Sequence, residues 1–240
     1  MANKKLTIAG ALLLGIVFTV IWLLLSNPRL YPIKTIQIQA SYQHINPDTL
    51  QNTITAHLTG NFFTLDVRQL KKSILQLPWV YSVDIKRVWP DKLIVYITEQ
   101  TAVACWNNNA LFNAAGQIFQ PGTGTARRAP TCPADLPQLQ GPTDQIVEVW
   151  QHYQQMNSLL FSKLGLTISK LTFDPQGIWQ LTLDNHIKVY LQNTDNEQQL
   201  MLFIKAYPKV IVGKIKRIDS VDMRYNETGF AIKWKNSHSN

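Results

Sequence analysis

Residues that could do enzyme chemistry are few and widely spaced in this chain of 240 residues. None of its five histidines is followed by glutamate, so the His-Glu-x-x-His pattern of zinc proteases is absent. No serine is followed three residues later by lysine, and neither a Gly-x-Ser-x-Gly turn nor a phosphate-binding lysine loop occurs. Scattered histidines of this kind are typical of surface or packing positions. They are His44, His57, His152, His186 and His238.

Two weaker patterns also fail to indicate an enzyme. Gly122-Thr-Gly124 imitates the start of a dinucleotide-binding fingerprint, but the third glycine is missing and no strand pattern precedes it. The 15 acidic residues are not concentrated in one segment, which argues against a two-carboxylate glycosidase without excluding it. We therefore expect no catalytic residue, no cofactor, no bound metal and no small-molecule substrate.

The two cysteines, Cys105 and Cys132, leave two interpretations open. In an oxidising compartment they could pair, and the entropy of loop closure gives such a bridge roughly 3–4 kcal/mol. A single pair is not a disulfide framework, however, and spacing alone does not show that the two sulfurs meet.

The last strand pattern of the chain could serve in binding. In Gly229–Lys235, Phe230, Ile232 and Trp234 occupy one face, and Lys233 and Lys235 occupy the other. A final strand at the edge of a sheet offers unpaired backbone groups to a partner strand. Lysines on an edge also protect it against unwanted pairing, and an aromatic face also serves as core. The residues by themselves favour neither interpretation.

An apolar run near the beginning of the chain decides where such a site could work. Leu6–Leu25 contains twenty residues without a charge and follows Lys4 and Lys5. A helix of that length spans roughly 30 Å, the thickness of the bilayer core. A cleaved signal peptide has a shorter core and a small-x-small site, which this run lacks. We predict a retained transmembrane helix at residues 6–25, with residues 1–5 as a short leader, and the slight charge bias around it leaves the orientation open.

The position of this helix predicts the topology. The leader is too short to be a domain, so the folded mass lies on the opposite side of the bilayer, and Trp22 and Tyr31 fit the aromatic preference for the interface. The rest of the chain keeps a moderate positive charge, which suits a surface near anionic lipid. No arginine-rich tract or RNA-binding aromatic motif indicates nucleic acid.

The next seventy residues have the pattern of a compact α+β domain. Ile33–Ala40 alternates like a half-buried strand, Asn46-Pro47 begins a helix, and Leu65-Asp66 begins a second helix that Pro78 ends. Two further strands are expected at Val80–Val88 and Lys92–Gln100, joined at Trp89-Pro90-Asp91. Strand, helix, helix, strand and strand predict helices on one face of a small sheet.

The remaining residues predict a second domain built on a mixed sheet with flanking helices. Pro121–Pro142, rich in proline and glycine, is predicted to be a long loop without an element. A helix is expected from about Asp144, and Thr194–Glu197 has the spacing of a capping box for another that ends near Pro208. A hairpin is expected to pair Ile215–Tyr225 with Gly229–Lys235 around Asn226–Thr228. The expected strands are 102–106, 110–112, 118–119, 169–173, 178–183 and 188–191.

Several motifs resemble the FtsQ/DivIB family of bacterial cell division proteins. The segment Trp79–Gln100 has the Trp-Val entry, the Arg-x-Trp-Pro turn and the Glu-Gln ending of that family's POTRA domain. Ala102–Trp106, Leu111–Phe119, Leu136–Pro142 and Val221–Tyr225 continue the resemblance. It implies the following division: leader 1–5, transmembrane helix 6–25, POTRA domain 33–101, β domain 102–235 with a partner-binding hairpin, and tail 236–240.

The resemblance implies a non-enzymatic scaffold of the division complex. Such a protein is a single-pass type II protein of the inner membrane, mainly periplasmic and enriched at the septum, and links early division proteins to septal wall synthesis. The family binds FtsB, itself paired with FtsL, by strand addition at the final strands. The matching positions here are Arg224, Tyr225, Gly229, Phe230 and Trp234, and we add the hypothesis that Arg224, Lys233 or Lys235 meets an acidic residue of FtsB.

The POTRA region of the family is linked to recruitment by FtsK, and the matching residues are Gln100 and Val103. Two other classes of protein stay open at this stage. Another POTRA-bearing membrane factor, in secretion or envelope assembly, usually carries repeated POTRA modules or a barrel, and neither pattern occurs here. An anchored periplasmic hydrolase needs a polar cleft, which the sequence does not indicate.

Overall fold

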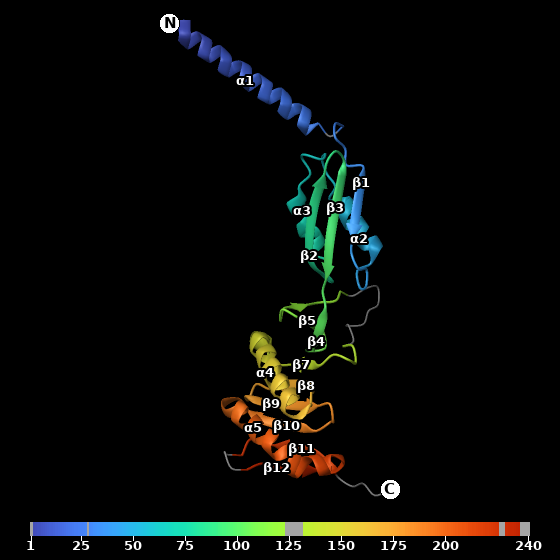
Figure 1. Ribbon diagram of the computed structural model, residues 1–240, viewed down its shortest axis with the longest axis vertical. Coiled ribbons are helices and arrows are strands. Elements are labelled where there is room, and N and C mark those ends of the chain that lie inside the picture. Colours follow the sequence, from blue (N-terminus) through green and yellow to red (C-terminus); the bar gives the residue numbers. More distant parts are fainter. Residues whose placement is uncertain (1, 28, 123–131, 226–228, 236–240) are drawn as a thin grey trace. The chain divides into compact units, whose positions relative to one another are not determined.

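The computed structural model describes residues 2–27, 29–122, 132–225 and 229–235. For residues 2–9, 11 and 26 it describes the backbone alone. The chain forms two compact units, Met1–Gln100 and Thr101–Asn240, which are described separately (Figure 1). The expected turn Asn226–Thr228 and tail 236–240 lie outside the described residues, as does the dinucleotide-like pattern after Gly122. The expected α+β class is confirmed.

The first unit begins with one long helix, α1 (Ala2–Ser26). Large apolar side chains on it, such as Leu14 and Phe18, are about 70 % exposed. Within the residues that the structure describes, no helix is both long enough and apolar enough to count as a membrane span.

A three-stranded sheet follows, built from β1 (Thr35–Gln39), β2 (Val80–Val88) and β3 (Lys92–Glu99). The strand order is β1-β3-β2, with β1 parallel and β2 antiparallel to β3. In β3, Leu93 and Val95 are fully buried while their neighbours are half-buried, because successive side chains of a strand point to opposite faces.

Two helices cover one face of this sheet, α2 (Pro47–Ala56) and α3 (Val67–Leu75) (Figure 1). Their N-caps are Asn46 and Asp66, whose side chains accept hydrogen bonds from backbone N–H groups of the first turn. The predicted starting points of both helices are therefore confirmed. Leu50, Ile54, Leu70 and Ile74 bury the apolar faces of the two helices.

The second unit is organised around a nine-stranded sheet of order β12-β11-β10-β9-β8-β7-β4-β5-β6. Most neighbours are antiparallel, whereas β10–β11, β7–β8 and β4–β7 are parallel, so the sheet is mixed as predicted. The strands are β4 (Ala102–Trp106), β5 (Ala110–Asn113), β6 (Ile118–Phe119), β7 (Gln138–Gln140), β8 (Ile168–Phe173), β9 (Ile178–Leu183), β10 (Lys188–Gln192), β11 (Ile218–Asp222) and β12 (Ala231–Trp234).

Two helices pack on this sheet and on each other, α4 (Ile146–Leu164) against β7 and β8 and α5 (Asn196–Ala206) against β10 (Figure 1). The helix expected from about Asp144 is confirmed as α4, in which Val149, Met156 and Leu160 face the core. Gly165 ends α4 in the left-handed region, with φ 68° and its N–H donating to Phe161 O. Short helical turns surround these elements at Thr143–Gln145, Asn193–Asp195, Tyr207–Ile211 and Val212–Arg217.

Three local predictions are wrong. The segment Pro121–Pro142 contains β7, in which Leu139 is fully buried and whose parallel pairing with β4 and β8 compensates for its short length. The capping box at Thr194 is absent, because Thr194 Oγ1 donates to Asp195 Oδ2 and a short helical turn precedes α5. Ile215 is helical, and the hairpin begins only at Ile218.

Cys105 and Cys132 form a disulfide, with their Cα atoms 5.8 Å apart. Cys105 is buried on β4, and Cys132 precedes the turn that leads into β7. The covalent bond therefore ties the segment just before β7 to β4, which is the parallel neighbour of β7 in the sheet.

Candidate functional site

The strand β12 is the last strand at one end of the nine-stranded sheet. It pairs antiparallel with β11, and no other strand of the described residues lies beside it. One row of its backbone groups is therefore open, which is the geometry that an added strand requires. We call this open side of β12 the C-terminal edge.

The backbone hydrogen bonds show which residues of β12 face outward. Lys235 N donates to Arg217 O at 2.8 Å, so the backbone groups of Lys235 point toward β11. Since backbone groups alternate in direction along a strand, those of Ile232 and Trp234 point toward the open side. Two residues of the predicted aromatic face thus carry the outward backbone groups of the C-terminal edge.

The side chains of that aromatic face divide into two kinds. Phe230 and Ile232 are half-buried and pack against the large core, where Ile232 lies opposite Val221. Trp234 is 44 % exposed, and its ring centroid lies 5.6 Å from the Arg217 guanidinium carbon and 5.9 Å from Lys214 Nζ. The first two side chains hold the strand, and the third is exposed on the surface between two cations.

Arg224 is held within the chain. Its Nε donates to Asp222 Oδ1 at 2.9 Å and its Nη2 to Asp222 Oδ2 at 2.6 Å, and its guanidinium lies 5.6 Å from the centre of the Tyr190 ring. The side-chain bond from Arg224 holds the pKa of Asp222 below its ordinary value of 3.8, and Asp222 in turn raises the pKa of Arg224. This bidentate pair orients the chain that leads from β11 to Tyr225.

The two lysines of the edge differ. Lys233 Nζ lies 3.8 Å from Asp219 Oδ2, with the Lys233 side chain 75 % exposed. Lys235 is exposed and makes no ion pair with any residue in the described part of the chain. Of the three basic residues considered for an acidic partner, Lys235 is the one whose charge is not already neutralised nearby.

Tyr225 and Gly229 flank the undescribed residues between β11 and β12. Tyr225 is 59 % exposed, which places a large aromatic ring at the surface beside Arg224. Gly229 is half-buried, but a Cβ built on it would meet no atom within 4 Å, so local packing does not require glycine there. Space for an incoming chain is one physical reason for a glycine at such a position.

Sequence reasoning missed the open face of the sheet beside β12. A shallow hollow of about 410 Å³ is lined there by residues of β10, β11 and β12. A second hollow of about 330 Å³ includes Asp222, Arg224 and Tyr225. The sequence carries only a weak signal for the first hollow, because its lining residues come from three separate strands, β10, β11 and β12. The lining residues of the first hollow are Tyr190, Ser220, Asp222, Ala231, Ile232 and Lys233.

The two residues predicted for recruitment lie on opposite sides of the unit boundary. Gln100 ends the first unit, where its N–H donates to Trp79 O at 2.8 Å, and Val103 lies on β4 and packs on the core of the second unit. Just before Gln100, burial raises the pKa of Glu99, but hydrogen bonds from Ser41, His44 and Gln43 outweigh it and lower the pKa overall. These bonds hold the 41–44 loop against the end of β3.

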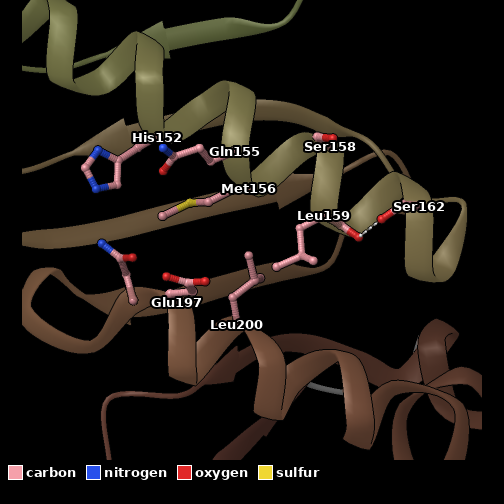
Figure 2. A pocket seen from close by; sticks show the side chains of 9 residues that line it. His152, Gln155, Met156, Ser158, Leu159, Ser162, Glu197 and Leu200 are labelled. Carbon is pink, nitrogen blue, oxygen red and sulfur yellow. Dashed lines mark hydrogen bonds between the residues drawn. The ribbon is translucent and has the colours of Figure 1, made fainter.

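A groove of about 430 Å³ lies between α4 and α5 (Figure 2). Figure 2 shows His152 near one end and Ser162 near the other, so they do not form a nucleophile–base pair. The His152 ring stacks on Trp179 at 4.7 Å, and Ser162 Oγ donates to Leu159 O within its own helix. His152 thus packs α4 against the sheet, and the Ser162 hydroxyl is bonded within its own helix. No cluster of metal ligands occurs within the described residues.

Comparison with known proteins covers both units. Residues 31–100 match the family described as POTRA domain, FtsQ-type, and residues 104–224 match the family described as Cell division protein FtsQ/DivIB, C-terminal. The second match ends before Tyr225, so β12 lies beyond it.

Similar whole proteins carry the name Cell division protein FtsQ. The Coxiella burnetii protein is 34 % identical over 212 residues, which cover 88 % of this chain and 84 % of the relative. The Allochromatium vinosum protein is 32 % identical, covering 98 % and 91 %, and the Escherichia coli protein is 30 % identical, covering 97 % and 86 %.

Proposed function

This chain belongs to the FtsQ/DivIB family of cell division proteins, and we propose that it is a non-enzymatic scaffold which joins early division proteins to the septal wall-synthesis machinery. Its mechanism is binding. The protein presents the C-terminal edge to a segment of FtsB, and FtsB brings FtsL into the same assembly.

The open side of β12 is the observation that carries this proposal. A partner strand placed there would continue the sheet by main-chain hydrogen bonds to Ile232 and Trp234. Exposed aromatic side chains give such an interface its affinity, and Trp234 and Tyr225 are the exposed aromatics at this end of the sheet. The path by which a partner strand reaches the C-terminal edge is lined by Arg224, Gly229 and Phe230. Positive charge on the edge comes from Lys233 and Lys235.

The affinity of the soluble part of FtsB for this protein tests the site. Replacing Trp234 or Tyr225 by alanine should weaken binding by about 1–3 kcal/mol, or about five- to 150-fold, because each ring would be buried by the partner. The fold should persist, since both side chains are largely exposed. Isothermal titration calorimetry measures the affinity, and circular dichroism checks the fold.

A control is Trp89→Ala, which removes an equally large and more exposed indole ring from the first unit. That variant should bind FtsB with unchanged affinity. If Trp234→Ala and Tyr225→Ala also bind normally, the C-terminal edge is not the FtsB site.

We further propose that residues 6–25 anchor the protein in the inner membrane, with residues 33–235 in the periplasm. The support is the uncharged run of twenty residues in the sequence, together with the exposed apolar side chains of α1. Extraction of cell membranes with alkaline carbonate tests the anchor, and a fluorescent fusion tests enrichment at the septum. Release by carbonate, or a uniform envelope signal, would contradict these assignments.

The domain assignments 33–101 for the POTRA domain and 102–235 for the β domain belong to the same proposal. The POTRA region, with Gln100 and Val103, is the part that we connect with recruitment by FtsK. Loss of septal localisation in a Gln100→Glu or Val103→Glu protein that still binds FtsB would support this separation of roles.

A further inference from the structure

Three segments of the first unit meet at one end of its small sheet. Because β1 and β3 are parallel, both begin at the same end, where α1 leads into β1 and the Trp89-Pro90 turn leads into β3 (Figure 1). The backbone bond from Lys34 N to Asp91 O, at 2.9 Å, joins these two segments directly. This is the end of the sheet that adjoins the anchor in the sequence.

The loop between α2 and α3 joins the same end. Phe62 N donates to Tyr31 O at 3.0 Å, and Arg87 Nη2 donates to Leu65 O at 2.6 Å. The loop therefore contacts both the chain that follows α1 and the end of β2.

Asn61 connects this loop to the end of α1. It is fully buried, and its amide nitrogen donates to Leu25 O at 2.7 Å, Asn27 O at 2.9 Å and Leu30 O at 3.3 Å. Its carbonyl oxygen accepts from Phe63 N and Thr64 N, both at 2.9 Å. One buried side chain thus satisfies one of the last carbonyls of α1 and two carbonyls of the segment that follows it, and it orders the loop at the same time.

Large apolar side chains are exposed on this end of the sheet. Their exposed fractions are 39 % for Leu30, 43 % for Tyr31, 44 % for Phe63, 40 % for Val88 and 70 % for Trp89. Tyr31 and Phe63 meet edge to face at 5.2 Å, and Tyr31 holds this position at a φ of 62°, which is unfavourable for tyrosine. A cluster of exposed rings kept in place at some cost indicates a binding surface.

The charges around these rings are mainly positive. Arg29 and Arg87 lie beside them, whereas Lys34 and Asp91 pair with each other at 3.4 Å and Asp66 is occupied as the cap of α3. Aromatic rings surrounded by cations suit the boundary between headgroups and acyl chains, where the ring body is apolar and the charges meet anionic lipid.

We propose that Leu30, Tyr31, Phe63, Val88 and Trp89 form a membrane-contact surface, which rests on the bilayer that holds the anchor of the same chain. This inference depends on the proposed anchor. The surface is continuous with the proposed anchor, which favours lipid over a protein partner. Leu30 and Tyr31 follow the apolar run within six residues, and Asn61 ties the loop that bears Phe63 to the end of that helix. The surface then sets the depth of the POTRA domain at the membrane.

Spin labels on β2 of the full-length protein test this arrangement. The chain is reconstituted in vesicles of phosphatidylethanolamine and phosphatidylglycerol without any other protein, and a cysteine replaces Val88 or, as the matched control, Tyr81. Both residues are exposed on β2, and their separation along the strand is about 23 Å. The native cysteines are joined to each other and do not take up the label.

The label at position 88 should be several-fold less accessible to a water-soluble nickel complex than the label at position 81, and more accessible to oxygen. Adding Trp89→Ala should raise the nickel accessibility at position 88. Adding Tyr42→Ala should not, because Tyr42 is an exposed ring in the loop held at the other end of β3.

The outcomes separate the two proposals. If the chain floats with the vesicles but both labels are equally accessible to nickel, the anchor stands and the membrane-contact surface is wrong. Protection that arises only after a partner's soluble part is added would also overturn the lipid assignment. If the chain does not float, the anchor fails and this inference fails with it.

Discussion

The two end strands of the large sheet are opposite in character. At one end, β6 is a strand of two residues, Ile118 and Phe119, and the disulfide of Cys105 lies two strands away on β4. At the other end, β12 extends over four residues with an open backbone and an exposed tryptophan. A very short edge strand offers few backbone groups to another chain. The sheet therefore offers few free backbone groups for strand pairing at β6, whereas β12 is open to a partner strand.

Removing the disulfide should give the largest effect and sharpen this contrast. In the double variant Cys105→Ser, Cys132→Ser the free energy of unfolding should fall by about 3–4 kcal/mol, because the unfolded chain regains the freedom of a loop of 27 residues. Urea unfolding under non-reducing conditions measures this difference. Affinity for FtsB should stay unchanged while the variant is folded, and a large loss of affinity would show that the two edges are coupled.

The charge of the open edge should contribute less. Lys235→Gln should weaken FtsB binding by up to about 1 kcal/mol, mostly through slower association at low salt, because an exposed pair gains little Coulomb energy in water. Lys233→Gln is the matched control, with a smaller effect expected because Asp219 already lies near that charge. Surface plasmon resonance at two salt concentrations separates the association rates. Equal effects of both variants would contradict the distinction between the lysines.

The approach to the open edge should also respond to acid. Since the pKa of Asp222 is lowered in the folded protein, its pair with Arg224 stabilises the fold fully above the ordinary aspartate value of 3.8. This stabilisation is lost as the pH falls through the lower, folded value. In Arg224→Gln this pH dependence of the stability should largely disappear, and Asp222 should take up its proton at a higher pH, because its pKa returns toward its ordinary range. Carboxyl chemical shifts by NMR measure the change, and identical titration curves in both proteins would contradict it.

The smallest effect is expected at the short edge. Ile118→Glu changes an exposed side chain of β6, and FtsB affinity and unfolding free energy should both stay within about 0.5 kcal/mol of the parent protein. The same affinity measurement applies. A loss as large as that predicted for Trp234→Ala would assign the binding edge to β6 and reverse the comparison.

Local patterns predicted much of the first unit correctly. The caps Asn46 and Asp66 and the alternation of Leu93, Val95 and Ile97 each depend on neighbours in the sequence, and the structure has the expected helices and strands there. The strand β7 was missed for the opposite reason. Its three residues carry no period of their own, and their backbone bonds come from β4 and β8, which are distant in the sequence.

The sequence predicted which residues belong to the candidate site but not which other side chains they contact. The alternation in Gly229–Lys235 indicated a final strand with an aromatic face, and β12 has that pattern. The contact of Lys214 and Arg217 with Trp234 was not predicted, because a helical turn precedes β11 where a strand was expected. The pairing of Arg224 with Asp222 was not predicted either.

Residue types and their local spacing were enough for the α+β class, most of the strand and helix segments, the family resemblance and the apolar run near the beginning. The tertiary structure decided that the two cysteines are bonded, that β12 ends the sheet, which backbone groups remain open, and that Tyr31, Phe63 and Trp89 lie at one end of the small sheet. Each of these results follows from pairing between distant segments, whose register and order no local pattern encodes.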